Sequence, residues 1–160
     1  MLLTGARRVA VLSVLTIGLL QGCASAPRQE AVSVPNGWPV NPNVASISSP
    51  FGARRGGSSH QGIDLSAPRG TPVWAAADGT VVFAGREGAY GRTVLIDHGN
   101  GYTTRYAHLK KIKVERGRRV KRGDVVGTVG ASGNASGPHL HYEVLRDGTP
   151  VDPRPYLGGG

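Results

Sequence analysis

The sequence predicts an all-β domain built around a single antiparallel sheet. Short Val-rich runs alternate with turn-forming residues, and the 160 residues include 25 glycines and 11 prolines. Few stretches show the apolar period of an amphipathic helix. The chain has room for one domain of about 100 to 150 residues plus a tail, which is enough to bury a core of its own.

Six runs with apolar alternation predict the strands of this sheet. Turn dipeptides that hairpins favour stand beside several of them, namely Asp78-Gly79, Asn100-Gly101 and Asp147-Gly148. We therefore expect neighbouring runs to pair antiparallel. The predicted strands are 72–76, 80–84, 93–98, 102–108, 125–129 and 139–145.

Residues 1–22 are predicted to be an export signal. Arg7 and Arg8 precede an apolar run, Val9 to Leu20, that is too short to cross a bilayer comfortably. Leu20-Gln21-Gly22-Cys23 contains the chain's single cysteine and resembles the lipobox of bacterial lipoproteins. We expect a lipid on Cys23 to anchor the protein to the outer membrane, on its periplasmic side. The alternative is an ordinary signal peptide with a chance cysteine.

Three further segments complete the predicted organisation. Residues 23–46 carry four prolines among small and polar residues, which predicts a lipidated N-terminus followed by a flexible linker. Residues 47–157 hold all of the predicted strands and are expected to form the domain. Residues 158–160 are expected to be a short tail.

Basic residues outnumber acidic ones and give a formal net charge of +9. Without Arg7 and Arg8 of the export signal, 17 basic residues face 10 acidic ones, which suits an anionic partner. Eight of the basic residues lie between Lys110 and Arg122 with one acid. A solvated surface is the default interpretation, and contact with an anionic wall or membrane is the alternative. An exported chain without aromatic residues interleaved for stacking is not expected to bind nucleic acid.

The first indication of a site comes from His139 and His141. On a β-strand both side chains point the same way, while the apolar residues between and after them fill the opposite face. An isolated pair of this kind is more often surface decoration than a pair of metal ligands. His60 and Asp64 supply further donors on one face of an extended segment, and we expect Gly62 to leave room for an ion between them.

His60, Asp64 and one of the two strand histidines would give a nitrogen, oxygen, nitrogen donor set. A fourth tetrahedral position would remain for water, which is the arrangement of catalytic zinc. The other histidines could then transfer protons or stabilise a developing oxyanion. The residues alone leave open which of His139 and His141 is the ligand.

Several motifs, in this order, resemble the lysostaphin-type, LytM-like zinc endopeptidases that cut peptidoglycan peptides. The resemblance covers residues 49–157. Its main motifs are His60-x-x-x-Asp64, Tyr106-Ala107-His108-Leu109 and Gly137-Pro138-His139-Leu140-His141-Tyr142-Glu143, and further likeness lies in 49–54, 62–68, 98–102 and 151–153.

This resemblance implies one zinc ion per chain, held by His60, Asp64 and His141, with His108 and His139 as catalytic groups. It also implies long loops around a zinc cleft and peptidoglycan as the substrate. The predicted function is zinc-dependent hydrolysis of peptide cross-links of peptidoglycan during cell-wall remodelling. The alternative is a non-catalytic wall-binding activator of a murein amidase, as in relatives that have lost ligands.

Two other side chains are weighed against structural roles. Glu143 lies on the same strand face as His141, so it either orients a neighbouring imidazole or is a structural or solvated carboxylate. His98 precedes Gly99-Asn100-Gly101 and is interpreted as a turn residue outside the site.

Overall fold

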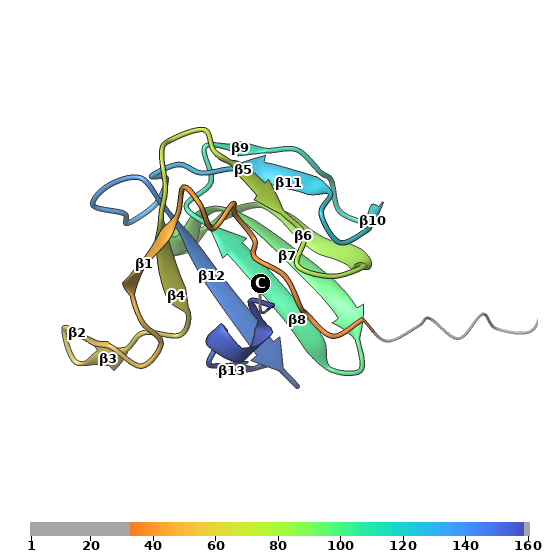
Figure 1. The fold of residues 1–160 in the computed structure, drawn as a ribbon, viewed down its shortest axis with the longest axis horizontal. Coiled ribbons are helices and arrows are strands. Elements are labelled where there is room, and N and C mark those ends of the chain that lie inside the picture. Colours follow the sequence, from red (N-terminus) through yellow and green to blue (C-terminus); the bar gives the residue numbers. More distant parts are fainter. Residues whose placement is uncertain (1–32, 159–160) are drawn as a thin grey trace, which may run out of the picture.

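An antiparallel sheet of eight strands forms the centre of the fold (Figure 1). The computed structural model describes residues 33–158, so the predicted export signal, Cys23 and the residues up to 32 lie outside it. The strands are β1 (Ser46–Ser49), β2 (Arg54–Arg55), β3 (Ser58–Ser59), β4 (Ile63–Ser66), β5 (Pro72–Trp74), β6 (Gly79–Glu87), β7 (Gly91–Gly99), β8 (Tyr102–Ala107), β9 (Lys111–Ile112), β10 (Arg119–Val120), β11 (Val125–Thr128), β12 (His139–Arg146) and β13 (Thr149–Val151).

The all-β prediction is confirmed, and each of the six predicted strands is present with shifted ends. The main sheet has the order β1-β4-β12-β8-β7-β6-β10, and β13 pairs with β12. A three-stranded sheet, β5-β11-β9, and a ribbon of β2 and β3 were not foreseen as separate units. Two short 3₁₀ helices, Gly88–Tyr90 and Arg154–Tyr156, complete the elements. Within residues 33–158, no helix has the length and apolar character needed to cross a membrane.

Two of the three predicted turn dipeptides close hairpins. Asn100-Gly101 joins β7 to β8 and Asp147-Gly148 joins β12 to β13, and all four residues have positive φ, as a type I′ turn requires. Asp78-Gly79 does not close a hairpin, which corrects that expectation. The reason is that β5 pairs with β11 in the small sheet, whereas β6 pairs with β7 and β10 in the main sheet.

Side chains alternate between the two faces of β12, and this alternation separates core from site. Leu140, Tyr142 and Val144 are completely buried on one face, where Val40 and Leu157 join the same core. Strand alternation places His141 and Glu143 on the other face, where their side chains contact each other. Tyr142 lies opposite Tyr106 of β8 and Ile63 of β4, so the central three strands share one apolar layer.

The start of the described chain is packed onto the domain. Val40 is fully buried, and Trp38 packs against the same core. The backbone N–H of Trp74 donates to Pro39 O at 2.8 Å, and Gly37 N–H donates to Tyr156 O at 3.1 Å. Part of the stretch that the sequence places in a linker, 23–46, therefore contributes to the core.

Candidate metal centre

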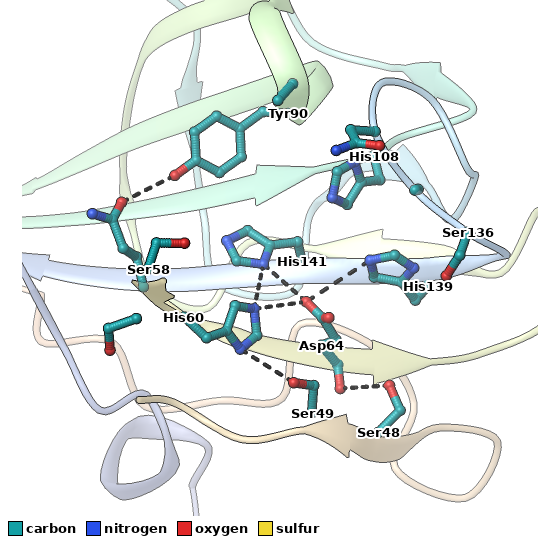
Figure 2. A pocket seen from close by; sticks show the side chains of 15 residues that line it. Ser48, Ser49, Ser58, His60, Asp64, Tyr90, His108, Ser136, His139 and His141 are labelled. Carbon is teal, nitrogen blue, oxygen red and sulfur yellow. Dashed lines mark hydrogen bonds and ion pairs between the residues drawn. The ribbon is translucent and has the colours of Figure 1, made fainter. Parts of the chain in front are cut away.

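Three buried donor side chains converge where β4 pairs with the first residues of β12 (Figure 2). Asp64 of β4 lies directly opposite His141 of β12 in the antiparallel register, which brings the two side chains onto the same face of the sheet. His60 enters from the segment that precedes β4. The Asp64 Oδ1 atom lies 2.9 Å from His141 Nδ1 and 3.1 Å from His60 Nε2, and the two nitrogens are 3.1 Å apart.

The outer nitrogen of each imidazole fixes its tautomer. His60 Nδ1 donates to the carbonyl oxygen of Pro50 at 2.9 Å, and His141 Nε2 donates to Glu143 Oε1 at 2.9 Å. Because a carbonyl and a carboxylate only accept, these nitrogens carry the protons of the neutral rings. The inner nitrogens therefore turn lone pairs toward each other and toward the Asp64 carboxylate. A proton or a metal ion must separate these three atoms.

The electrostatics of the cluster favour a cation. Burial raises the pKa of Asp64, but the hydrogen bond from a protonated His141 and the charges of His60 and His141 outweigh burial and hold the Asp64 pKa well below its usual value. Burial lowers the pKa of His141, but its bonds to Asp64 and Glu143 outweigh burial and raise it overall. A positive charge in the cluster, either a proton or a metal ion, is therefore favoured.

The donor set fits zinc. Ligand atoms around a tetrahedral zinc ion with bonds of about 2.0 to 2.1 Å lie about 3.3 Å from one another, close to the separations of the three atoms here. Two imidazole nitrogens and one carboxylate oxygen are common zinc ligands, and three protein ligands leave a fourth position open. This is the pattern of a catalytic site.

His108 and His139 lie beside the cluster, and each ring is oriented by a hydrogen bond from Nδ1 to a backbone carbonyl. His108 Nδ1 donates to Ser132 O at 2.8 Å, and His139 Nδ1 donates to Gly137 O at 2.9 Å. Both Nε2 atoms are therefore lone-pair acceptors. The two ring centroids are 4.8 Å apart, and His139 Nε2 lies 3.8 Å from Asp64 Oδ1. The structure thus brings all five of the predicted site residues within residues 33–158 into one place.

His108 is held in an unusual backbone conformation. Its φ is 59°, a left-handed value that is uncommon for a residue with a side chain and that clusters at functional sites. The backbone N–H of His108 donates to Tyr90 O at 2.9 Å, which stabilises this turn directly after β8. Burial lowers the pKa of His108, so the imidazole stays neutral at neutral pH and can accept a proton.

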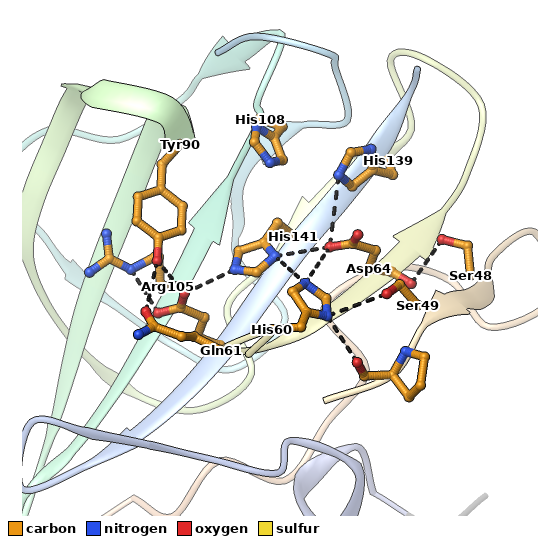
Figure 3. Close-up of polar contacts among 12 residues, drawn as sticks. Ser48, Ser49, His60, Gln61, Asp64, Tyr90, Arg105, His108, His139 and His141 are labelled. Atoms are coloured by element: carbon orange, nitrogen blue, oxygen red, sulfur yellow. Dashed lines mark hydrogen bonds and ion pairs between the residues drawn. The ribbon is translucent and has the colours of Figure 1, made fainter. Parts of the chain in front are cut away.

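Glu143 connects the cluster to a buried polar network (Figure 3). Its carboxylate is 1% exposed and accepts hydrogen bonds from His141, from Tyr90 Oη at 2.7 Å and from Arg105 Nε at 2.9 Å. Arg105 also forms an ion pair with Glu87. Burial raises the pKa of Glu143, but the bonds from His141 and Tyr90 outweigh burial and lower it. Burial and the bond to Glu143 raise the pKa of Tyr90 to about 12.

The sequence alone offers an orienting role for Glu143 as one of two interpretations. It does not identify Tyr90 or Arg105 as part of the site. Arg105 lies directly opposite Glu143 in the register of β8 and β12. That register would have identified the pair, but it depends on how the strands align rather than on any local motif. The orienting interpretation of Glu143 is the one that its contacts support.

Gly62 has a different role from the one expected. A Cβ atom at this position would lie 2.3 Å from Tyr142 O and 2.9 Å from Glu143 Cγ. The missing side chain therefore lets the segment before β4 approach β12 and Glu143, and it does not make room for an ion.

His98 lies apart from the metal centre. It is 3% exposed on β7, where Nδ1 bonds Asp78 O at 2.7 Å and Nε2 bonds Thr104 Oγ1 at 2.7 Å. The residue is a buried structural histidine in a strand, which corrects its interpretation as a turn residue. Burial lowers its pKa.

The cluster forms the floor of an open pocket of about 800 Å³. Serines and amides from several segments surround the imidazoles (Figure 2). Asn134, Ala135 and Ser136 form one wall, so the loop before β12 contributes to the pocket as well as leading to it. This volume lies within the range of about 300 to 1,000 Å³ that is typical of ligand-binding sites. The rim residues are Ser48, Ser49, Ser58, Ser59, Gln61, Ala89, Tyr90, Asn134, Ala135 and Ser136.

A β-sheet cleft with a His, Asp, His donor set beside two further imidazoles is the arrangement that catalytic zinc sites use. The model of peptidase family M23 matches residues 58–153, which is more than half of the chain and includes all five site residues. The chain therefore belongs to peptidase family M23.

Two curated relatives are similar to more than half of the chain. The chain is 48% identical over 123 residues to the DD-carboxypeptidase/endopeptidase Mpg of Neisseria meningitidis serogroup B, which covers 73% of this chain and 28% of that protein. It is 47% identical over 93 residues to the peptidoglycan DD-endopeptidase ShyA of Vibrio cholerae, covering 58% of this chain and 22% of that protein. The chain thus spans less than a third of the length of either relative.

Solved structures show the same fold. A zinc-containing peptidase from Vibrio cholerae superimposes with a TM-score of 0.70 at 36% identity, covering 78% of this chain and 40% of that chain. The catalytic domain of lysostaphin from Staphylococcus simulans superimposes with a TM-score of 0.62 at 31% identity, covering 70% and 89% respectively. The predicted lysostaphin-type fold is confirmed.

Proposed function

We propose that this chain is a zinc-dependent endopeptidase that hydrolyses peptide cross-links of peptidoglycan during cell-wall remodelling. The observation that carries the proposal is the convergence of His60 Nε2, Asp64 Oδ1 and His141 Nδ1 within about 3 Å of one another at the floor of a pocket of about 800 Å³. Membership of peptidase family M23 and the similarity to a protein named as a peptidoglycan DD-endopeptidase support the substrate class.

In this proposal His60, Asp64 and His141 hold the zinc ion. When bound, zinc supplies a Lewis acid that polarises the scissile carbonyl and lowers the pKa of water. Glu143 holds the His141 ring in the tautomer that leaves Nδ1 free, and Pro50 O does the same for Nε2 of His60. The ring nitrogens that would bind zinc are thus already oriented before a substrate binds.

His108 and His139 are proposed to move the protons of the reaction. Each donates its Nδ1–H to a backbone carbonyl, so Nε2 is the atom that can accept a proton from the attacking water. The same atom can return that proton to the amine that leaves when the peptide C–N bond breaks. The lowered pKa of His108 supports the accepting role, because the ring stays neutral until the water is deprotonated.

The bond between D-alanine and diaminopimelate is the proposed target, and a glycine bridge is the alternative. The names of the Neisseria and Vibrio relatives refer to DD-peptide bonds, which favours the first. The rim of serines, Asn134 and Gln61 can donate to and accept from a peptide backbone across the pocket.

We also propose that the chain is exported and anchored through Cys23 to the outer membrane, facing the periplasm. The predicted signal of residues 1–22 and the position of the only cysteine support this location. A substrate in the cell wall agrees with it. Labelled palmitate in cells should enter the wild-type chain and not the Cys23→Ser variant, and equal labelling of both would contradict the anchor.

Digestion of purified cross-linked muropeptides tests the central activity. The zinc-loaded chain should convert cross-linked dimers to monomers that gain one water for each bond cut, and mass analysis identifies the bond. His141→Ala should leave the dimers intact. If folded, zinc-loaded protein leaves every muropeptide uncut but stimulates a murein amidase, the chain is a non-catalytic activator instead.

A further inference from the structure

A dense set of cations lies outside the metal centre. The segment from Lys110 to Arg122, called the basic segment below, holds eight of the chain's 19 basic residues and one acid, Glu115. It carries +7 of the chain's net charge of +9. All eight basic residues are exposed, and none of them lines the pocket of the metal centre. Apart from Arg119, none of them forms an ion pair with a carboxylate of residues 33–158.

The described chain begins beside the end of this basic segment. Arg122 donates its backbone N–H to Asp78 Oδ1 at 2.8 Å and its guanidinium Nη1–H to Asn36 O at 3.0 Å. The backbone N–H of Asp78 in turn donates to Ser33 Oγ at 3.1 Å. Cys23 precedes Ser33 by ten residues, which reach at most about 35 Å even when fully extended. A lipid on Cys23 would therefore keep this side of the domain close to a bilayer.

A hollow lined by tryptophan lies next to the same end of the basic segment. It has a volume of about 540 Å³ and is lined by Trp38, Trp74 and Arg122, among others. These are the only two tryptophans of the chain, and both are partly exposed. Indole rings beside cations suit the headgroup region of a bilayer, where the ring contacts apolar groups and the cations meet phosphates.

The metal centre opens on the opposite face of the main sheet. Val40 and Trp38 belong to the segment that covers the core face of β12. In Figure 1 this segment crosses the sheet near β8 and β12. His141, which belongs to the metal centre, leaves β12 on the other face. The beginning of the described chain and the tryptophan hollow therefore lie on the side away from the cleft.

We propose that the basic segment and the tryptophan hollow together bind anionic phospholipid headgroups. The bound domain would lie on the membrane with its cleft directed away, toward the cell wall. The inference rests on the lipid anchor of the proposed function, since the anchor brings this side to the membrane. The surface then acts as a second signal beside the acyl chains. A membrane accounts for the charge, the indoles and the place where the chain enters the domain, whereas a wall glycan accounts only for the charge and the indoles.

Vesicle binding tests this surface without the anchor. The chain lacking its export signal and carrying Cys23→Ser should sediment with vesicles of phosphatidylcholine and phosphatidylglycerol, and not with phosphatidylcholine alone. Raising the salt to about 1 M should release it, because the Debye length falls to about 3 Å. Fluorescence should shift to the blue on binding, since Trp38 and Trp74 are the only indoles. Equal binding to both vesicles, or an unshifted spectrum, would overturn the inference.

Two matched charge-reversal variants locate the binding surface. Changing Lys113, Arg116, Arg118 and Lys121 to Glu should lower binding by more than about tenfold, since each cation near an anionic surface contributes substantially. The control changes the exposed Arg69, Arg86, Arg92 and Arg146 to Glu, with the same change in net charge, and should keep most of the binding. Equal losses in both variants would show a general charge effect and contradict a defined surface.

Cleavage assays separate this inference from the proposed function. The basic-segment variant should still bind zinc and cut soluble muropeptides, because none of its four residues lines the metal-centre pocket. If the wild-type chain instead sediments with purified peptidoglycan and not with vesicles, the surface binds the wall and the membrane inference is wrong, while the endopeptidase proposal stands.

Discussion

The eight residues of β12 present two faces that differ in role: one stabilises the fold, and the other carries residues of the metal centre. Leu140, Tyr142 and Val144 are completely buried on one face, and burial of an apolar side chain such as Leu140 or Val144 contributes about 1.5 to 3 kcal/mol. On the other face, His141 helps to hold three lone-pair atoms about 3 Å apart, which costs free energy unless a cation lies between them. One face of β12 therefore stabilises the fold, and the other supplies residues of the metal centre.

Metal removal should have the largest effect, and it should fall on function. Chelation is expected to abolish muropeptide cleavage, and added zinc should restore it. The free energy of unfolding should fall by about 2.7 kcal/mol relative to protein in zinc at 100 times its dissociation constant. Far-ultraviolet circular dichroism should still show the β-sheet at 25 °C. Complete unfolding on chelation would mean that the core face does not hold the fold alone.

Leu140→Ala should lower the stability of the fold and leave zinc binding by the folded protein unchanged. The side chain is completely buried in the core, so its loss should lower the free energy of unfolding by about 2 to 5 kcal/mol. Urea denaturation measures this loss. Below the unfolding transition, zinc bound per folded molecule should stay at one. A loss of zinc from folded protein would show that the two faces are not independent.

Glu143→Gln should weaken zinc binding by about 10 to 100-fold, since the residue orients His141 and keeps its inner nitrogen free. Competition with a zinc chelator gives the affinity. Unchanged zinc affinity and unchanged cleavage would dispose of the orienting role.

Glu87→Gln is the matched control at the outer end of the same network. Glu87 pairs with Arg105, but its side chain is 38% exposed, and an exposed pair contributes at most about 1 kcal/mol. Zinc affinity measured by the same competition should change by less than about fivefold. A change as large as that of Glu143→Gln would mean that the whole chain of charges, and not the contact with His141, sets the affinity.

Local patterns were sufficient for the elements that depend on local chemistry. Asn100-Gly101 and Asp147-Gly148 supplied the positive φ values of two hairpins, and strand alternation placed His139 and His141 on one face. The residues alone could not choose the ligand between those two histidines, and family resemblance pointed to His141. The structure gives a physical reason, because His141 is the residue directly opposite Asp64.

Features that depend on long-range packing could not be predicted. The contact between Arg105 and Glu143 follows from the alignment of β8 and β12, and the role of Gly62 follows from the approach of Tyr142 O. Val40 lies in a proline-rich stretch that has the composition of a linker, yet it is buried in the core. In each case the deciding atom belongs to a residue distant in the sequence.

The most direct test compares His139→Ala with His141→Ala, two residues apart on the same strand face. Zinc content by elemental analysis and cleavage of cross-linked muropeptides are measured on both purified, folded variants. We expect His141→Ala to lose zinc and cleavage together, whereas His139→Ala should keep one zinc per chain and lose cleavage. Zinc retained in His141→Ala, or lost in His139→Ala, would contradict the assignment of ligand and catalytic histidine.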